Sequence, residues 1–184
     1  THFLGLDCLL QGRWDALADF AKANRLTMYL VGGFVRDTLL SRDRLPDNVD
    51  LALSTHALDV AKALAAALSG TYICLDDAAG SARVVITSEQ QRLAVDLSDF
   101  RGRSLEDDLR RRDFTLNALA VPLEAWQVDP HWTARLVDPL GGRADLERRV
   151  ATIGANVEET PRTEQERATR TRDYQKLNEH YVAL

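Results

Sequence analysis

Two glycines and an arginine stand close together in the run Leu30-Val31-Gly32-Gly33-Phe34-Val35-Arg36-Asp37. Glycine permits positive φ and lets another group approach the backbone closely. A helix that begins after such a turn presents free backbone N–H groups to an anion, and an arginine in its first turn binds phosphate oxygens in pairs. We therefore predict a phosphate site at Gly32, Gly33 and Arg36. The structural alternatives are an ordinary turn and an ion pair between Arg36 and Asp37.

Acidic residues interrupt two apolar strands further along the chain. Because strand side chains alternate between faces, Asn48 and Asp50 point the same way while their apolar neighbours face the core. Asp96 occupies a similar position within Leu93–Leu97. Burying an unpaired carboxylate is costly, so each needs a cation, an arginine or a hydrogen-bond network. A magnesium ion that also binds substrate phosphates fits this pattern, and an ion pair of each aspartate with an arginine is the alternative.

A third charged group follows in the segment Leu105–Leu119. Three arginines, Arg110 to Arg112, precede Asp113, and Asn117 stands four residues later. By itself this segment is typical of a solvated, charged helix end.

The net charge of −5 argues against a general nucleic-acid coat protein, because such proteins bind largely by neutralising phosphates with Lys and Arg. A local basic patch remains available at Arg101, Arg103, Arg110, Arg111 and Arg112. No apolar run approaches the roughly 20 residues that span a bilayer, and no export signal opens the chain. We expect a cytoplasmic protein. Cys8 and Cys74 lack zinc-site spacing, so we expect both to be reduced and partly buried.

Hydrophobic periodicity predicts a mixed α+β domain. We expect helices at 12–24, Phe34–Leu40, 55–68, from Ser104, Phe114–Ala120 and Ala144–Arg149. We expect strands at Met28–Val31, Asn48–Leu53, Thr71–Leu75, Ala82–Thr87, Arg92–Leu97 and Leu136–Gly142, with a hairpin closed by residues 88–91. Residues 41–47 are predicted to form a loop. Thr55 is a plausible N-cap of the helix expected at 55–68, and Gly70 is a plausible C-cap of the same helix.

Taken in order, the segments LVGGFVRD, NVDLAL, VDLSDFR, DDLRRRDFTLNAL and LVDPLGG resemble the catalytic head of the tRNA nucleotidyltransferase and poly(A) polymerase family, the class II type of nucleotidyltransferase. The resemblance covers about residues 28–150. It implies a small, mostly antiparallel sheet backed by helices. It also implies template-independent transfer of AMP, and of CMP as a second possibility, from a nucleoside triphosphate to an RNA 3′ end, that of tRNA foremost.

The resemblance also implies residue roles. Asp50 would bind Mg²⁺, with Asp96 as a supporting carboxylate and Asn48 at the remaining catalytic and metal-binding position. Gly33 and Arg36 would contact the triphosphate of ATP or CTP. The full nucleotide-binding set would be Gly32, Gly33, Arg36, Arg112, Asp113 and Asn117, with Arg112 at phosphate or sugar and the last two shaping the sugar site.

Two features depart from the family pattern. The family's strand reads Asp-x-Asp, whereas Asn48 stands at its first position and brings no charge. Either a bulge brings Asp47 to the site, or the domain is catalytically weak, or the asparagine was introduced. The second departure is the absence after Val150 of the Glu-Asp-x-x-Arg motif by which the family selects the base.

We expect a head domain over residues 1–154 and a polar tail, or an atypical neck, over 155–184. One alternative function is a catalytically impaired module that binds nucleotide or RNA, which Asn48 favours. Another is a nucleotidyltransferase with a small-molecule or protein acceptor, against which the segment RRDFTLNAL argues.

Overall fold

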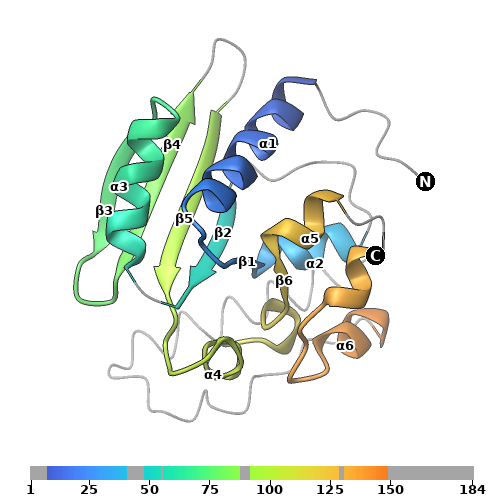
Figure 1. Ribbon diagram of the computed structural model, residues 1–184. Coiled ribbons are helices and arrows are strands. Elements are labelled where there is room, and N and C mark those ends of the chain that lie inside the picture. The colour runs from blue at the N-terminus through green and yellow to red at the C-terminus, as the bar shows by residue number, and fades with distance from the viewer. Residues whose placement is uncertain (1–7, 41–47, 55, 88–91, 129–130, 149–184) are drawn as a thin grey trace.

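A six-stranded sheet organises the part of the chain that the computed structural model describes, which is residues 8–40, 48–54, 56–87, 92–128 and 131–148 (Figure 1). The strands lie in the order β3-β4-β5-β2-β1-β6. Only β2 and β5 run parallel, and the other neighbours are antiparallel. This confirms the predicted mostly antiparallel sheet. The strands are β1 (Met28–Val31), β2 (Asn48–Leu53), β3 (Thr71–Asp76), β4 (Ser81–Thr87), β5 (Arg92–Asp99) and β6 (Ala120–Pro122).

Helices cover one face of this sheet. In Figure 1, α1 and α3 lie on the same face, with α3 over β3 and β4 and α1 in contact with α3 and α5. The helices are α1 (Cys8–Ala23), α2 (Gly33–Leu39), α3 (Ala57–Ala67), α4 (Leu105–Arg110), α5 (Leu123–Val128) and α6 (Gly142–Arg148), with 3₁₀ turns at Thr115–Asn117 and Trp132–Arg135. The predicted amphipathic first helix is confirmed, since Trp14, Leu17 and Ala21 are buried.

The two faces of the sheet differ in what covers them. The helical face holds the main core, to which β2 contributes Val49, Leu51 and Leu53. The opposite face carries a smaller cluster around Val31 and Ala52. This smaller cluster, together with the alternation of β2, leaves Asn48 and Asp50 only partly buried. The predicted orientation of these two side chains is therefore confirmed.

One row of paired residues crosses the sheet on the face opposite the helices, which we call the polar face. Val31 pairs with Asp50, Asp50 with Asp96, and Asp96 with Arg83, on β1, β2, β5 and β4 respectively. Because side chains at paired positions point to the same side, the register brings Asp50, Asp96 and Arg83 next to one another. The sheet thus assembles the polar site from strands that are distant in sequence.

The start of α3 differs from the sequence expectation. Thr55 lies outside the described residues, and His56 holds the N-cap position with a left-handed φ of 63° and no side-chain capping bond. Asp99 replaces the cap, because its Oδ1 accepts a hydrogen bond of 2.9 Å from the backbone N–H of Ala57. A carboxylate at the end of β5 therefore caps a helix 42 residues away in sequence.

The end of α3 also differs from the expectation. Ser69, with a φ of 52°, takes the left-handed conformation expected next to the helix end, so Gly70 is not the residue that provides it. Gly70 is needed for another reason. A Cβ there would lie 3.0 Å from the carbonyl oxygen of Val85, so this glycine lets the helix end approach β4 closely.

The prediction of a helix over Phe114–Ala120 is wrong. Only a short 3₁₀ turn forms, and Ala120–Pro122 instead makes the edge strand β6 beside β1. All three residues of β6 are buried, so sheet completion and burial override local helix propensity. The predicted strand over Leu136–Gly142 is reduced to a bridge between Val137 and Ala120. Helix α5 was not predicted, and it places Trp126 with its ring centre 5.1 Å from that of Phe34.

The remaining expectations concern the two cysteines, the predicted loop and tail, and membrane-spanning segments. Cys74 is free, as expected, but exposed rather than partly buried, because the edge strand β3 has little cover. The side chain of Cys8, the predicted loop 41–47 and the predicted tail 155–184 lie outside the described residues. None of the helices in the described ranges has the length and apolarity needed to cross a bilayer.

Candidate nucleotide and cation site

The glycine turn between β1 and α2 is shaped around a carboxylate. Gly32 has a φ of +70°, and a Cβ there would lie 3.2 Å from Oδ2 of Asp50 and 3.6 Å from Nη1 of Arg112. A side chain at this position would meet both strained backbone geometry and these two groups. The turn is therefore more than a change of chain direction, because it brings the backbone against Asp50.

Arg36 lies in α2, directly after this turn, and its guanidinium is fixed by two partners. Nε and Nη2 donate to the carboxylate of Asp37 at 2.9 and 3.2 Å, which is the structural alternative considered above. Nη1 donates to Oδ1 of Asn117 at 2.6 Å, although these residues are 81 positions apart. The fold thus brings together two of the predicted nucleotide-binding residues.

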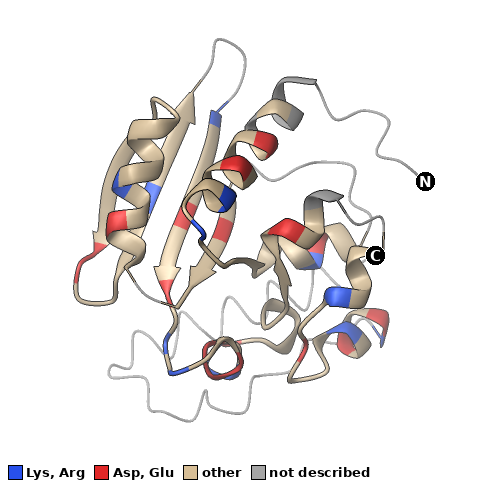
Figure 2. Cartoon of the chain, in the orientation of Figure 1, with Lys and Arg blue, Asp and Glu red and all other residues tan. Residues whose placement is uncertain are grey.

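Asp50 and Asp96 occupy neighbouring positions on β2 and β5, and Figure 2 shows acidic positions on these strands with a basic position on β4. Burial raises the pKa of the Asp50 carboxyl, and the nearby Asp96 charge raises it further. Arg112, Arg83 and Arg36 oppose this shift. Additional positive charge near Asp50 would therefore stabilise the ionised form of this carboxyl.

Asp96 already has such a charge. Nε of Arg83 donates to Oδ1 of Asp96 at 2.6 Å, and Nη2 donates to Oδ2 at 2.7 Å. This two-point pair raises the pKa of the Arg83 guanidinium. The arginine alternative considered for Asp96 is therefore present in the structure.

Asn48 lies between the two carboxylates. Its Nδ2 donates to Oδ1 of Asp50 at 3.5 Å and to Oδ2 of Asp96 at 3.3 Å, so both contacts are long. Its Oδ1 is buried and has no hydrogen-bond partner. The described part of β2 pairs with β5 in continuous register from Asn48 onwards, so it contains no bulge; Asp47 lies outside the described residues.

These residues suit one divalent cation better than two. Carboxylate and amide oxygens are the hard ligands that Mg²⁺ takes, and it completes its shell with waters and phosphates. The unpaired Oδ1 of Asn48 and the desolvated Asp50 both fit a nearby cation. Within the described ranges, however, no cluster of three or more His, Cys, Asp or Glu residues could hold a metal ion.

Arg112 and Asp113 behave differently from one another. Arg112 donates from Nε and Nη2 to Oδ2 of Asp108 at 3.2 and 3.0 Å, and the Asp108 side chain is only 1% exposed. This pair directs Arg112 towards the glycine turn and Asp50. Asp113 is exposed, and its Oδ1 accepts from the backbone N–H of Phe114, so the structure does not bring it to the carboxylates.

The predicted basic patch is only partly a surface feature. Four of its members are exposed, namely Arg101, Arg103, Arg110 and Arg111. Arg112 is partly buried in its pair with Asp108. The segment therefore separates one arginine that points to the site from others that face solvent.

Two residues that position this site were missed by sequence reasoning, although the sequence contained a signal for each. β4 and β5 pair antiparallel from Thr87 and Arg92, and counting back along both strands pairs Arg83 with Asp96. Asp108 stands four residues before Arg112, a spacing that favours an ion pair on a helix.

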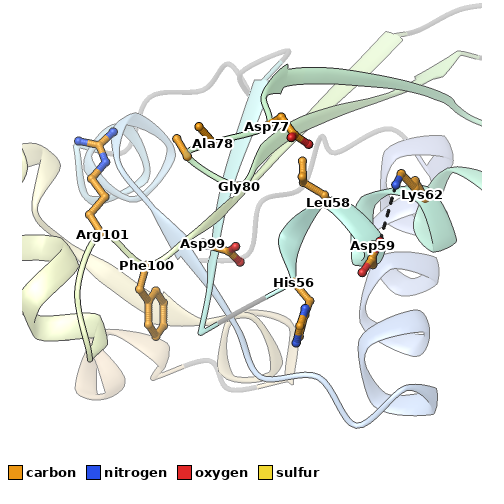
Figure 3. Close-up of a pocket in the computed structure, with 11 residues that line it drawn as sticks. His56, Leu58, Asp59, Lys62, Asp77, Ala78, Gly80, Asp99, Phe100 and Arg101 are labelled. Atoms are coloured by element: carbon orange, nitrogen blue, oxygen red, sulfur yellow. Dashed lines mark ion pairs between the residues drawn. The ribbon is translucent and has the colours of Figure 1, made fainter.

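A separate cavity of about 640 Å³ lies at the start of α3, next to the end of β5 and the β3–β4 turn (Figure 3). Asp59, Lys62 and Arg101 are among its charged lining residues, and Asp99 faces it beside Gly80. None of the predicted catalytic or nucleotide-binding residues lines it. Its lining comes from the start of α3, the β3–β4 turn and the end of β5, so it is distinct from the site formed by Asn48, Asp50 and Asp96.

Comparison with known proteins identifies the family. The model of the poly(A) polymerase head domain matches residues 28–152. The CC-adding tRNA nucleotidyltransferase of Geobacter sulfurreducens is 38% identical over 135 residues, which are 73% of this chain and 28% of that protein. The A-adding tRNA nucleotidyltransferase of Deinococcus radiodurans is 45% identical over 121 residues, 66% of this chain and 24% of that protein.

Solved structures agree with this assignment. The Thermotoga maritima CCA-adding enzyme in complex with tRNA superposes with a TM-score of 0.64 at 29% identity, covering 80% of this chain and 33% of that chain. A complex of a CCA-adding enzyme with CTP gives a TM-score of 0.64 at 28% identity and covers 34% of that chain. The chain thus spans about a quarter to a third of the relatives it matches. It belongs to the poly(A) polymerase head domain family.

Proposed function

We propose that this chain is the nucleotide-binding and catalytic head of a template-independent RNA nucleotidyltransferase. Its reaction is the transfer of AMP, CMP or both from the triphosphate to the 3′ end of tRNA. The observation that carries the proposal is the approach of Asp50 to the glycine turn and Arg112, on the face that also bears Asp96. The relatives are named as CC-adding, A-adding and CCA-adding enzymes, which supports the reaction class.

In this proposal the triphosphate lies between the glycine turn and two oriented arginines. Gly32 and Gly33 leave room for close approach, and Arg36 and Arg112 offer guanidinium groups held by Asp37 and Asp108 respectively. Asn117 fixes the other end of the Arg36 guanidinium and, with Asp113, shapes the sugar site. Pre-oriented arginines bind phosphate with less loss of side-chain freedom than mobile ones.

Mg²⁺ would be held chiefly by Asp50, with Asp96 in support and the amide oxygen of Asn48 as a neutral ligand. When bound, the cation neutralises phosphate charge and activates the attacking RNA 3′-hydroxyl. The protein's own part is to fix the carboxylates on adjacent strands and to direct Arg112 towards the phosphates. Phosphoryl transfer depends mainly on such positioning and charge stabilisation.

The test is incorporation of labelled CMP and AMP into tRNA lacking its 3′ terminus, with and without Mg²⁺. The chain is measured alone and joined to the remaining two-thirds or more of the Geobacter relative. We expect magnesium-dependent addition in the joined protein, lost in Asp50→Asn and retained in the control Asp59→Asn, which changes an exposed aspartate on α3. Addition that is indifferent to Asp50 would contradict the proposal.

A second candidate function is a nucleotide-binding module with little catalytic activity. The specific observation in its favour is the neutral Asn48 amide between Asp50 and Asp96, which supplies hydrogen bonds where a third charged ligand would stand. ATP or CTP binding by calorimetry without any magnesium-dependent addition, in both the chain and the joined protein, would favour this alternative.

A further inference from the structure

Val31, Asp50, Asp96 and Arg83 are paired across the polar face, and Arg83 is the charged member of this row to which the sequence motifs give no role. It stands on β4 directly opposite Asp96, and Ala82 and Val84 on either side of it are buried in the core. The sheet register therefore sets its direction, and its guanidinium bonds both oxygens of Asp96 at 2.6 and 2.7 Å. Such a short, two-point contact is a strong form of ion pair.

This pair limits what Asp96 can offer to another cation. Both of its oxygens direct electron density to the guanidinium, and Oδ2 also accepts from Nδ2 of Asn48. By contrast, among the described residues Asp50 accepts only the long 3.5 Å contact from Asn48. Two carboxylates at the same level of adjacent strands are thus unequal as metal ligands.

The charges around Asp50 and Asp96 also favour a single cation. Asp50 and Asp96 carry two negative charges, Arg83 returns one, and Asn48 contributes none. Arg112 and Arg36 also act on Asp50, and each is paired with its own aspartate, Asp108 and Asp37. A face with so little net negative charge suits one divalent cation that also binds phosphate, whereas a pair of such ions would need more carboxylates. The Arg83 side chain is 35% exposed, so water competes with its pairing and the guanidinium has space to move aside.

We infer that Arg83 is a positioning residue of the candidate site: it holds Asp96 in a charge-compensated pair and thereby weakens the binding of a divalent cation there. The inference rests on the proposed function, because it places the cation beside Asp50. It adds that cation affinity is restrained from β4, a strand that β5 and β2 separate from β1 and its glycine turn.

Mn²⁺ is the probe, because its free concentration can be measured by electron paramagnetic resonance with the complete chain and no nucleotide. We expect Arg83→Gln to bind Mn²⁺ about tenfold more tightly than the parent, since a charge-assisted contact no longer competes for Asp96. Adding Asp96→Asn to this variant should remove the gain. Unchanged or weaker binding by Arg83→Gln, or a gain that persists in the double variant, would overturn the inference.

Controls separate this effect from general charge and from loss of structure. Arg92→Gln removes the same charge from β5, four residues from Asp96, and should leave Mn²⁺ affinity within about twofold of the parent. Arg83→Lys keeps the charge but lacks the planar fork that matches both oxygens, so it should tighten binding by about two- to threefold. If Arg83→Gln does not fold, Arg83→Lys decides: unchanged or weaker binding contradicts the inference.

A further variant distinguishes failure of the inference from failure of the proposed function. Asp50→Asn should abolish Mn²⁺ binding whatever stands at position 83. If Asp50→Asn binds Mn²⁺ normally, the proposed cation site is wrong. If Asp50→Asn loses binding while Arg83→Gln gains none, the site stands and only the role of Arg83 is wrong.

Discussion

The two carboxylates of the polar face differ in their charged partners, although they lie on adjacent strands of one sheet. Asp50 and Asp96 stand at paired positions on β2 and β5, yet Asp96 has a two-point partner in Arg83 while Asp50 lies partly buried beside the glycine turn. Burial and Asp96 raise the pKa of Asp50, so its ionised form is disfavoured in the isolated protein. Of these two aspartates, Asp96 is therefore compensated by an arginine within the fold, whereas Asp50 is the one that a bound cation would stabilise.

This difference teaches where stability and function conflict. A charge that is compensated within the fold stabilises it, whereas a charge left for a substrate or cation costs stability until the ligand binds. Five predictions test this contrast and the site around it, beginning with the variant of largest expected effect.

Asp50→Asn should lower magnesium-dependent nucleotide addition by at least about a hundredfold, because it removes the principal charged ligand of the cation. The measurement is labelled nucleotide incorporation by the joined protein described above. The same substitution at exposed Asp59 serves as the control. An equal loss in both variants would show that the assay reports general charge rather than the site.

Asn48→Asp should tighten Mn²⁺ binding by about tenfold or more and raise addition, because a third carboxylate joins the face that Asp50 and Asp96 share. Asp47→Ala should then have no effect in the parent chain. The outcome against this prediction is loss of activity in Asp47→Ala together with little change in Asn48→Asp, which would mean that Asp47 is the missing ligand.

Arg36→Ala should weaken ATP binding about tenfold, because a charge-assisted contact to phosphate contributes roughly 1.5–3 kcal/mol. Isothermal calorimetry measures the affinity. Arg143→Ala removes an exposed arginine that pairs with Glu147 on α6, and it should bind ATP normally. Equal affinities in the parent and Arg36→Ala would remove Arg36 from the phosphate site.

Two stability changes of opposite sign form the smallest expected effect. In the cation-free protein at pH 7, Asp50→Asn should increase the free energy of unfolding, whereas Asp96→Asn should decrease it by about 1 kcal/mol as the Arg83 pair is lost. Urea denaturation measures both. Destabilisation by both variants to the same extent would remove the distinction between the two carboxylates.

The Asp50 effect should depend on pH in a defined direction. Because the pKa of Asp50 is raised in the folded protein, the folded state binds its proton more tightly than the unfolded state does. Stability is then lost as pH rises from the ordinary value of 3.8 through the raised folded value. The advantage of Asp50→Asn should therefore be larger at neutral pH and shrink as the pH falls towards 3.8.

Local patterns in the sequence were sufficient for much of the fold. β1 and β2 were predicted with their observed ends, and the alternation in β2 placed Asn48 and Asp50 on one face. These elements follow from apolar periodicity and glycine punctuation, which act over a few residues. The failure at Phe114–Ala120 has the opposite cause, because β6 exists only by pairing with a strand about ninety residues earlier.

The sequence by itself determined the residue types of the site and the family to which the chain belongs. The tertiary structure decided how those residues are paired: Arg36 with Asn117, Asp96 with Arg83, and Asp50 against the glycine turn. The reason is that a carboxylate's charge state depends on burial and on neighbours brought by sheet register, neither of which is a property of its own segment. Local motifs identify the residues that can do the chemistry, and contacts between strands set the balance of charge among them.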